Sequence, residues 1–102
     1  GVTFLSTVKV AYYGLVKNIV GISEEEIVLG KETRLRELLD TLAERHGDSL
    51  RFSLLNARGE LRPLARVMLN GESLEDTGGL EAILKPDQNV SIFLMVAPAE
   101  GG

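Results

Sequence analysis

One segment of the chain carries a clear helical pattern, and the other apolar segments have to pack around it. In "TRLRELLDTLAERHG", residues 33–47, four leucines recur with the spacing of a single helix face, at positions 35, 38, 39 and 42. Thr33 is predicted to cap the start of this helix, and Gly47 is predicted to end it in a left-handed conformation. One amphipathic helix needs a partner surface, so the other segments are expected to form a sheet.

The first half of that sheet is predicted from residues 3–13 and 24–29. The first of these segments alternates apolar and polar residues, with one face formed by Phe4, Val8, Val10 and Tyr12. The second, "EEEIVL", is predicted to pair with it as an antiparallel hairpin. Residues 14–21 between them are predicted to be a loop with one helical turn.

The second half comes from the C-terminal part of the chain. Residues 48–62 are predicted to contain a short helix and a turn, and residues 63–74 a strand that ends in a tight turn at Asn70-Gly71. Residues 89–96, "NVSIFLMV", are predicted to be the last strand, with Val90, Ile92, Leu94 and Val96 facing inward. A central last strand beside the first makes the terminal strands parallel neighbours. The predicted fold class is α+β, a β-grasp with a mixed sheet and one main helix packed on one face.

Composition limits what such a domain can do. The chain has 102 residues, a formal net charge of −4 and no cysteine. The length predicts one domain over residues 1–97 and a short flexible tail over residues 98–102. The absence of a basic cluster argues against nucleic-acid binding, and the absence of cysteine excludes disulfides and thiolate metal sites within this sequence. No apolar run is long enough for a membrane helix, so we expect a cytoplasmic protein that does not bind membranes.

No catalytic constellation is evident among the side chains. His46 is the only histidine, and it is predicted to be a surface residue that interacts with the helix dipole. The glutamates at 24–26 are predicted to form a solvated strand edge rather than a metal site. The arginines of residues 50–66 are predicted to form a solvated face. We therefore expect no bound metal or cofactor and no enzymatic activity of the chain's own side chains.

The last strand leads directly into "APAEGG", which ends in Gly101 and Gly102. One interpretation is a disordered chain end. The other is that the terminal carboxylate is the functional group. The residues alone leave both open.

Several segments in this order resemble the ubiquitin-like sulfur carriers of the MoaD/ThiS family, and most closely its MoaD-like members. The resemblance rests on "VKVAYYGLVKNIVG", the helix "TRLRELLDTLAERHG", "GELRPLARVMLNGESL", "GGLEAILKPDQNVSIF" and the terminal glycine pair. Segments like residues 48–62 are usual in MoaD-like proteins and generally missing from the shorter ThiS carriers.

The resemblance implies a function at Gly102. A ubiquitin-activating-type enzyme, MoeB- or ThiF-like, would use ATP and Mg²⁺ to adenylate this carboxylate, which a sulfide equivalent would then convert to a thiocarboxylate. In molybdopterin synthase the thiocarboxylate delivers sulfur within a MoaE-like large subunit. Glycine at 101 and 102 suits a tail that threads a narrow channel, because it has no Cβ.

Phe93 and Met95 on the last strand alternate with the inward set, so they are predicted to face away from the helix. We expect them to dock partners beside the tail. The tail departs from the shorter "VAGG"-like ends of the relatives because Pro98, Ala99 and Glu100 precede the glycines. A protein modifier joined through Gly102 to lysines of target proteins, a carrier for another thio-metabolite, and a plain interaction module remain alternatives.

Overall fold

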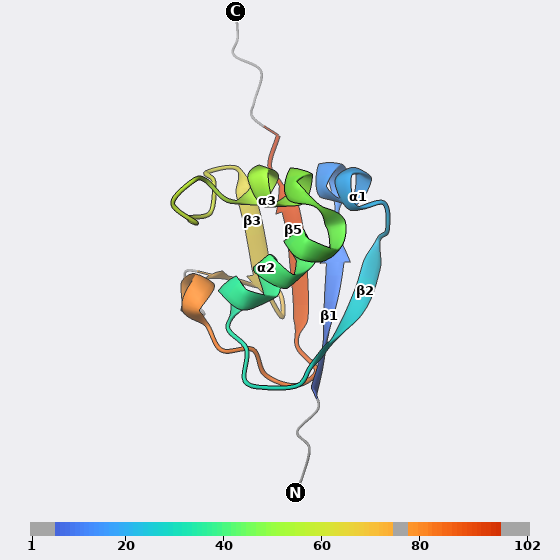
Figure 1. The fold of residues 1–102 in the computed structure, drawn as a ribbon, viewed down its shortest axis with the longest axis vertical. Helices are drawn as coiled ribbons and strands as arrows, with labels where there is room; N and C mark the ends of the chain where they lie inside the picture. The colour runs from blue at the N-terminus through green and yellow to red at the C-terminus, as the bar shows by residue number, and fades with distance from the viewer. Residues whose placement is uncertain (1–5, 75–77, 97–102) are drawn as a thin grey trace, which may run out of the picture.

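Three helices cover one face of a mixed sheet (Figure 1). The computed structural model describes residues 6–74 and 78–96. The elements in these ranges are, in chain order, β1 (Ser6–Tyr12), α1 (Gly14–Val20), β2 (Glu24–Leu29), α2 (Leu35–His46), α3 (Asp48–Leu54), β3 (Ala65–Leu69), β4 (Glu72–Ser73), the 3-10 helix η2 (Gly79–Glu81) and β5 (Asn89–Leu94).

The strand order places the last strand at the centre of the sheet. The order is β2-β1-β5-β3-β4 within the described residues. β5 runs parallel to β1, with Val10 opposite Val90 and Tyr12 opposite Ile92, and antiparallel to β3. β1 and β2 form the predicted antiparallel hairpin. The parallel pairing of the terminal strands is therefore confirmed, and the architecture is the expected β-grasp.

The leucine stripe of α2 fills the space between helices and sheet. Its four leucines are buried, as are the inward residues Val8 and Val10 of β1 and Val90 and Ile92 of β5. At about 25 cal/mol per Å² of apolar surface removed from water, these contacts dominate the favourable terms in folding. Phe4, which was expected on the same face of β1, lies outside the described residues.

Both ends of α2 differ from the predicted capping. The N-cap residue is Arg34, whose backbone N–H donates to Glu37 Oε1 over 3.0 Å, whereas the Thr33 hydroxyl donates to the Lys31 carbonyl. Gly47 does end the helix, but with φ 103° and ψ 173° rather than the left-handed helical pair. This extended region with positive φ is open essentially only to glycine, and it turns the chain directly into α3.

Residues 14–21 form more helix than predicted. α1 spans seven residues and ends at Gly21, which has the left-handed conformation. Val16 is fully buried, and Ile19 and Val20 pack against the core. Tertiary packing rather than intrinsic propensity thus stabilises a helix too short to be stable alone.

A hydrogen-bonded loop follows α3 and precedes β3. Leu55 and Leu61 form an isolated bridge, and the Asn56 side chain accepts hydrogen bonds from the backbone N–H groups of Arg58 and Glu60. The predicted turn at Arg58-Gly59 lies at its tip. The predicted turn at Asn70-Gly71 joins β3 to β4, and both of its residues have positive φ.

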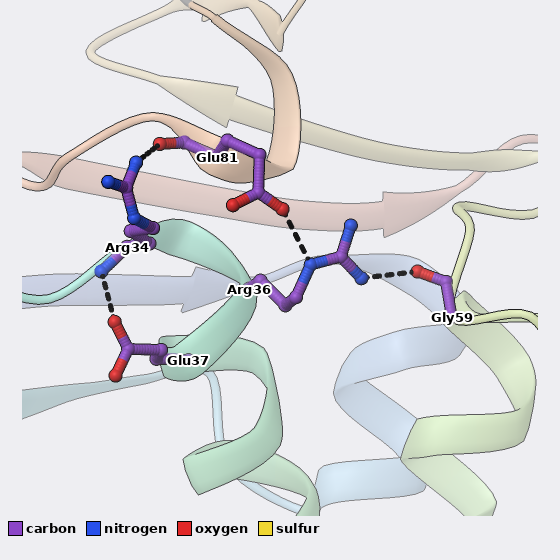
Figure 2. Close-up of polar contacts among 5 residues, drawn as sticks. All are labelled: Arg34, Arg36, Glu37, Gly59 and Glu81. Carbon is purple, nitrogen blue, oxygen red and sulfur yellow. Dashed lines mark hydrogen bonds and ion pairs between the residues drawn. The ribbon is translucent and has the colours of Figure 1, made fainter.

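Arg36 on α2 connects this loop to η2. Its Nε donates to Glu81 Oε1 over 2.7 Å and its Nη1 to the Gly59 carbonyl over 2.7 Å. Figure 2 shows the guanidinium between the two segments, with Arg34 reaching the Glu81 carbonyl from the other side. One side chain thereby holds two connections that are distant in sequence against the start of α2.

Candidate functional site

The chain leaves the sheet at the end of β5, and backbone hydrogen bonds hold this exit on both sides. The Tyr13 N–H donates to the Ile92 carbonyl over 3.1 Å on the β1 side. The Met95 N–H donates to the Leu64 carbonyl over 2.7 Å on the β3 side. Backbone hydrogen bonds therefore hold the chain as far as Met95, just past the end of β5 (Figure 1).

Exposed apolar side chains surround this exit. Met95 is 45% exposed and Val96 is 78% exposed. Tyr13 and Leu64, which form the two hydrogen bonds at the exit, also expose large side chains. Leu15 is exposed on the first turn of α1, the helix that packs on β5. We call this set the tail-root surface; it consists of Tyr13, Leu15, Leu64, Met95 and Val96. Several exposed large apolar side chains near one chain exit are typical of a protein-binding site.

The two predicted docking residues differ in exposure. Phe93 lies on the face of β5 opposite to Ile92, across from Arg66 of β3, and is half-buried. Met95 follows the strand and belongs to the tail-root surface. Their role in docking stays a prediction. Gly101 and Gly102, predicted to be the reactive end, lie outside the described residues, as does the predicted boundary between domain and tail.

One predicted inward residue is placed differently. Val96 was expected in the core, but β5 ends at Leu94 and the Val96 side chain is exposed. Tyr13, Leu15 and Leu64 were not singled out from the sequence. The available signal was that each is a large apolar residue next to Gly14 or Pro63, residues that commonly interrupt regular structure.

A partly buried polar cluster lies at the end of α2 and was not predicted from the sequence. Glu25 Oε2 accepts a hydrogen bond from the Tyr12 hydroxyl over 2.6 Å and lies 2.5 Å from His46 Nε2, while Arg45 Nη1 donates to Glu25 Oε1 over 2.8 Å. The Glu25 and His46 side chains are only 11% and 14% exposed. The prediction of a surface histidine is therefore wrong. The prediction of a solvated edge holds for Glu24 and Glu26, but not for Glu25, which points inward.

The electrostatics of this cluster favour a charged Glu25 and a neutral Tyr12. Burial raises the pKa of Glu25, but hydrogen bonds from Tyr12, His46 and Arg45 outweigh it and hold this pKa below its usual value. Burial, followed by the hydrogen bond to Glu25, raises the pKa of Tyr12 well above that of free tyrosine. The aromatic ring of Tyr12 also meets the His46 imidazole edge-on at 5.9 Å. These groups satisfy one another, so the cluster anchors the end of α2 to β1 and β2.

Within residues 6–74 and 78–96, no group of three or more histidine, cysteine, aspartate or glutamate side chains is arranged to hold a metal ion. No helix in the same ranges has the length and apolar character required to cross a bilayer.

Comparison with known proteins connects this geometry to a family. The model of the ThiS family matches residues 10–98, which begin within β1 and extend past the exit of β5. A comparison of the sequence with curated proteins finds no match.

Solved structures share the fold. The putative molybdopterin converting factor subunit 1 of Pyrococcus furiosus is 24% identical with a TM-score of 0.72, over 89% of this chain and 99% of that one. A chain of the Amycolatopsis orientalis BexX/CysO complex is 25% identical with a TM-score of 0.74, over 90% and 99%. The small archaeal modifier protein 1 of Haloferax volcanii is 18% identical with a TM-score of 0.75, over 89% and 99%. With a family model that matches nearly the whole chain, the protein belongs to the ThiS family of ubiquitin-like sulfur carriers.

Proposed function

We propose that this protein carries sulfur on the carboxyl group of Gly102 and donates it in molybdopterin biosynthesis. The observation that carries the proposal is the ThiS family match over residues 10–98. The position of β5 supports it, because the central strand leads the chain out of the sheet through the tail-root surface. The likeness of fold to a putative molybdopterin converting factor subunit is consistent with the molybdopterin pathway.

The proposed chemistry takes place at the chain end. A carboxylate oxygen of Gly102 attacks the α-phosphorus of ATP, pyrophosphate leaves, and an acyl adenylate forms. A sulfide equivalent then attacks the acyl carbon and displaces AMP, which leaves a thiocarboxylate. The partner holds ATP and Mg²⁺, which stabilise the charge on the phosphates. This chain contributes the tail and the surface that guides it, as a carrier subunit in the cytoplasm.

The partners follow from these steps. An adenylating enzyme of the MoeB or ThiF type would bind the tail first, and a MoaE-like large subunit would receive the sulfur. The tail-root surface is suited to transient binding of both, because its apolar side chains are already exposed in the free domain.

A second candidate is a protein modifier joined through Gly102 to lysines of target proteins. The fold is similar to that of the small archaeal modifier protein 1 of Haloferax volcanii. The residues Pro98, Ala99 and Glu100 also lengthen the tail, which is easier to reconcile with varied acceptors. A carrier for a thio-metabolite outside the molybdopterin pathway would use the same activation.

Mass spectrometry of protein from the native host separates these functions. A thiocarboxylate increases the intact mass by the difference between sulfur and oxygen, and removing Gly101 and Gly102 should abolish this species and molybdopterin synthesis. Glycine-glycine remnants on lysines of other proteins would instead support the modifier. If neither product forms and the deletion has no phenotype, activation at Gly102 is wrong.

A further inference from the structure

A groove on the helical side of the domain lies between α2, α3 and the loop that follows α3. It is lined chiefly by Arg36, Asp40, Arg51, Phe52, Gly59 and Arg62, and we call it the arginine groove. Its charge contrasts with that of the chain, which carries a net charge of −4. Three arginines and one aspartate line it, and although Arg36 pairs with Glu81 and Arg51 with Asp40, the positive side chains still outnumber the negative ones. Such a local reversal of sign attracts negatively charged groups to this part of the surface.

The arginines are oriented by the fold and keep donors available. Arg51 Nη1 donates to Asp40 Oδ1 over 2.8 Å, and Arg62 Nε donates to the Phe52 carbonyl over 2.5 Å. Each of these is the single side-chain hydrogen bond of that guanidinium among the described residues, and a guanidinium has five N–H donors. The remaining N–H groups can bind carboxylates in the paired geometry that arginine favours.

The groove also has an apolar wall. Phe52 is 62% exposed although it lies in the middle of α3. An aromatic ring that lines the same groove as the guanidinium groups offers a contact surface for an aliphatic or aromatic side chain, in addition to the charges. The groove therefore suits a peptide segment that combines acidic and apolar residues better than it suits a small inorganic anion.

The loop that forms one side is held rigidly before any ligand binds. Arg36 bonds the Gly59 carbonyl, the Asn56 side chain bonds two backbone N–H groups across the loop, and Arg62 N–H bonds the Leu54 carbonyl. Figure 2 shows the first of these contacts. Preorganisation of this kind lowers the entropic cost of binding.

The groove lies near the exit of the tail. Arg62 lies two residues before Leu64, and the Leu64 carbonyl accepts the hydrogen bond from the Met95 N–H. α3 and its loop lie at the same end of the molecule as the end of β5 (Figure 1). A protein that engages the tail therefore comes close to the groove. The adenylating enzyme is the partner common to the sulfur-carrier and modifier functions, since both require an activated Gly102.

We propose that the arginine groove binds an acidic segment, bearing at least one apolar side chain, of the enzyme that adenylates Gly102. This inference rests on the proposed function for the identity of the partner, but the chemistry of the groove does not depend on it. Charged contacts beside the reacting tail orient the carrier and accelerate its encounter with the enzyme.

The first test measures adenylation of the full chain by the activating enzyme of the native host, at several salt concentrations. Arg51→Gln is expected to raise the KM for the carrier about fivefold with little change in kcat, because the groove contributes to docking rather than chemistry. Phe52→Ala should act in the same direction. Lys85→Gln is the matched control, since it removes the same charge from the loop at the opposite end of β5. Equal thermal midpoints would establish that all variants fold.

The second test needs no enzyme. NMR titration at low salt with a blocked, glutamate-rich peptide that contains a single phenylalanine should shift the amide signals of Phe52 and Gly59, and Arg51→Gln should weaken the response. The corresponding lysine-rich peptide should leave these signals unchanged. Absence of the glutamate-dependent shifts would overturn the proposed binding chemistry.

The two tests distinguish the possible failures. If wild-type protein is adenylated and Arg51→Gln behaves like Lys85→Gln, the docking inference is wrong and the proposed function stands. If wild-type protein is not adenylated at all, the proposed function fails, and the partner assigned to the groove fails with it, while the peptide titration still decides whether the groove binds acidic segments.

Discussion

His46 at the end of α2 lies 2.5 Å from Glu25 on β2, although the two residues are 21 positions apart in the chain. The Tyr12 hydroxyl donates to the same carboxylate oxygen, so a helix and two strands meet at one largely buried carboxylate. Such a cluster is costly to disrupt, because removing the anion leaves its donors unpaired within the protein.

The first prediction is that Glu25 makes stability depend on acid pH. Since the folded pKa is lowered, the stabilisation from Glu25 is fully present above its unfolded pKa and is lost as the pH falls through the folded value. Glu25→Gln should lower the free energy of unfolding near neutral pH by about 2 kcal/mol. This difference in the free energy of unfolding should shrink below about pH 4.3, where the wild-type protein also becomes less stable. Urea unfolding at a series of pH values between about 3 and 7 measures the free energy of unfolding of both proteins.

The neighbouring substitution Glu26→Gln is the control for this prediction. Glu26 is exposed on the other face of β2, so the change should have little effect at any pH. Equal behaviour of the two variants would show that the buried cluster contributes nothing specific to stability.

The second prediction concerns alkaline pH and Tyr12. Its folded pKa is raised by burial and by Glu25, so this stabilisation is fully present below the unfolded pKa, about 10, and is lost as the pH rises above it. In a Tyr13→Phe protein Tyr12 is the only tyrosine. Its tyrosinate absorbance should therefore appear together with unfolding followed by circular dichroism. Ionisation of Tyr12 in a protein that remains folded would contradict the assignment.

The third prediction is that Arg36 restrains the loop after α3. Arg36→Ala removes the bonds to Gly59 and Glu81 and should cost about 1 kcal/mol of stability. Hydrogen exchange should accelerate at the Gly59 and Glu60 amides, which are bonded within the loop. Lys31→Ala breaks only an exposed ion pair of 3.7 Å with Glu37, so exchange in the loop should not change. Unchanged exchange in Arg36→Ala would mean that the loop is rigid without this contact.

The fourth prediction tests the tail-root surface. Met95→Asp should reduce adenylation by the activating enzyme at least about tenfold, because a charge in an apolar contact must be desolvated on binding. Phe93→Asp should act similarly but with some loss of stability, since Phe93 is half-buried. Val28→Asp, at an exposed apolar position on β2, serves as the control and should be activated normally. Normal activation of Met95→Asp would exclude this surface from docking.

The local patterns predicted most of the fold. The leucine spacing of α2, the alternation in β1 and β5 and the Asn70-Gly71 turn each depend on residues that are close in sequence, and each is confirmed. Other features depend on tertiary placement. α1 forms because Val16 can be buried against neighbours that no local pattern identifies. His46 is largely covered because Glu25, 21 positions away on β2, meets its imidazole at the end of α2.

The candidate site was predictable to a smaller extent. The alternation of β5 correctly places Phe93 opposite to the inward residues, because side chains alternate strictly within a strand. That rule stops applying where pairing ends, which is why Val96 is exposed. Tyr13 and Leu64 belong to the tail-root surface because they are hydrogen-bonded to Ile92 and Met95 respectively, and such contacts between distant segments have no signature in the sequence.

The central position of β5 also determines how the domain responds to mechanical force. Traction applied to the C-terminal end acts along β5, which is flanked by parallel β1 and antiparallel β3. The ladders on both sides are then loaded in shear, so their hydrogen bonds must rupture together instead of opening one after another. Resistance to forced unfolding is a matter of rate, and a ladder loaded in this way unfolds slowly. Traction on the C-terminal end of β5 is thus resisted by both ladders at once.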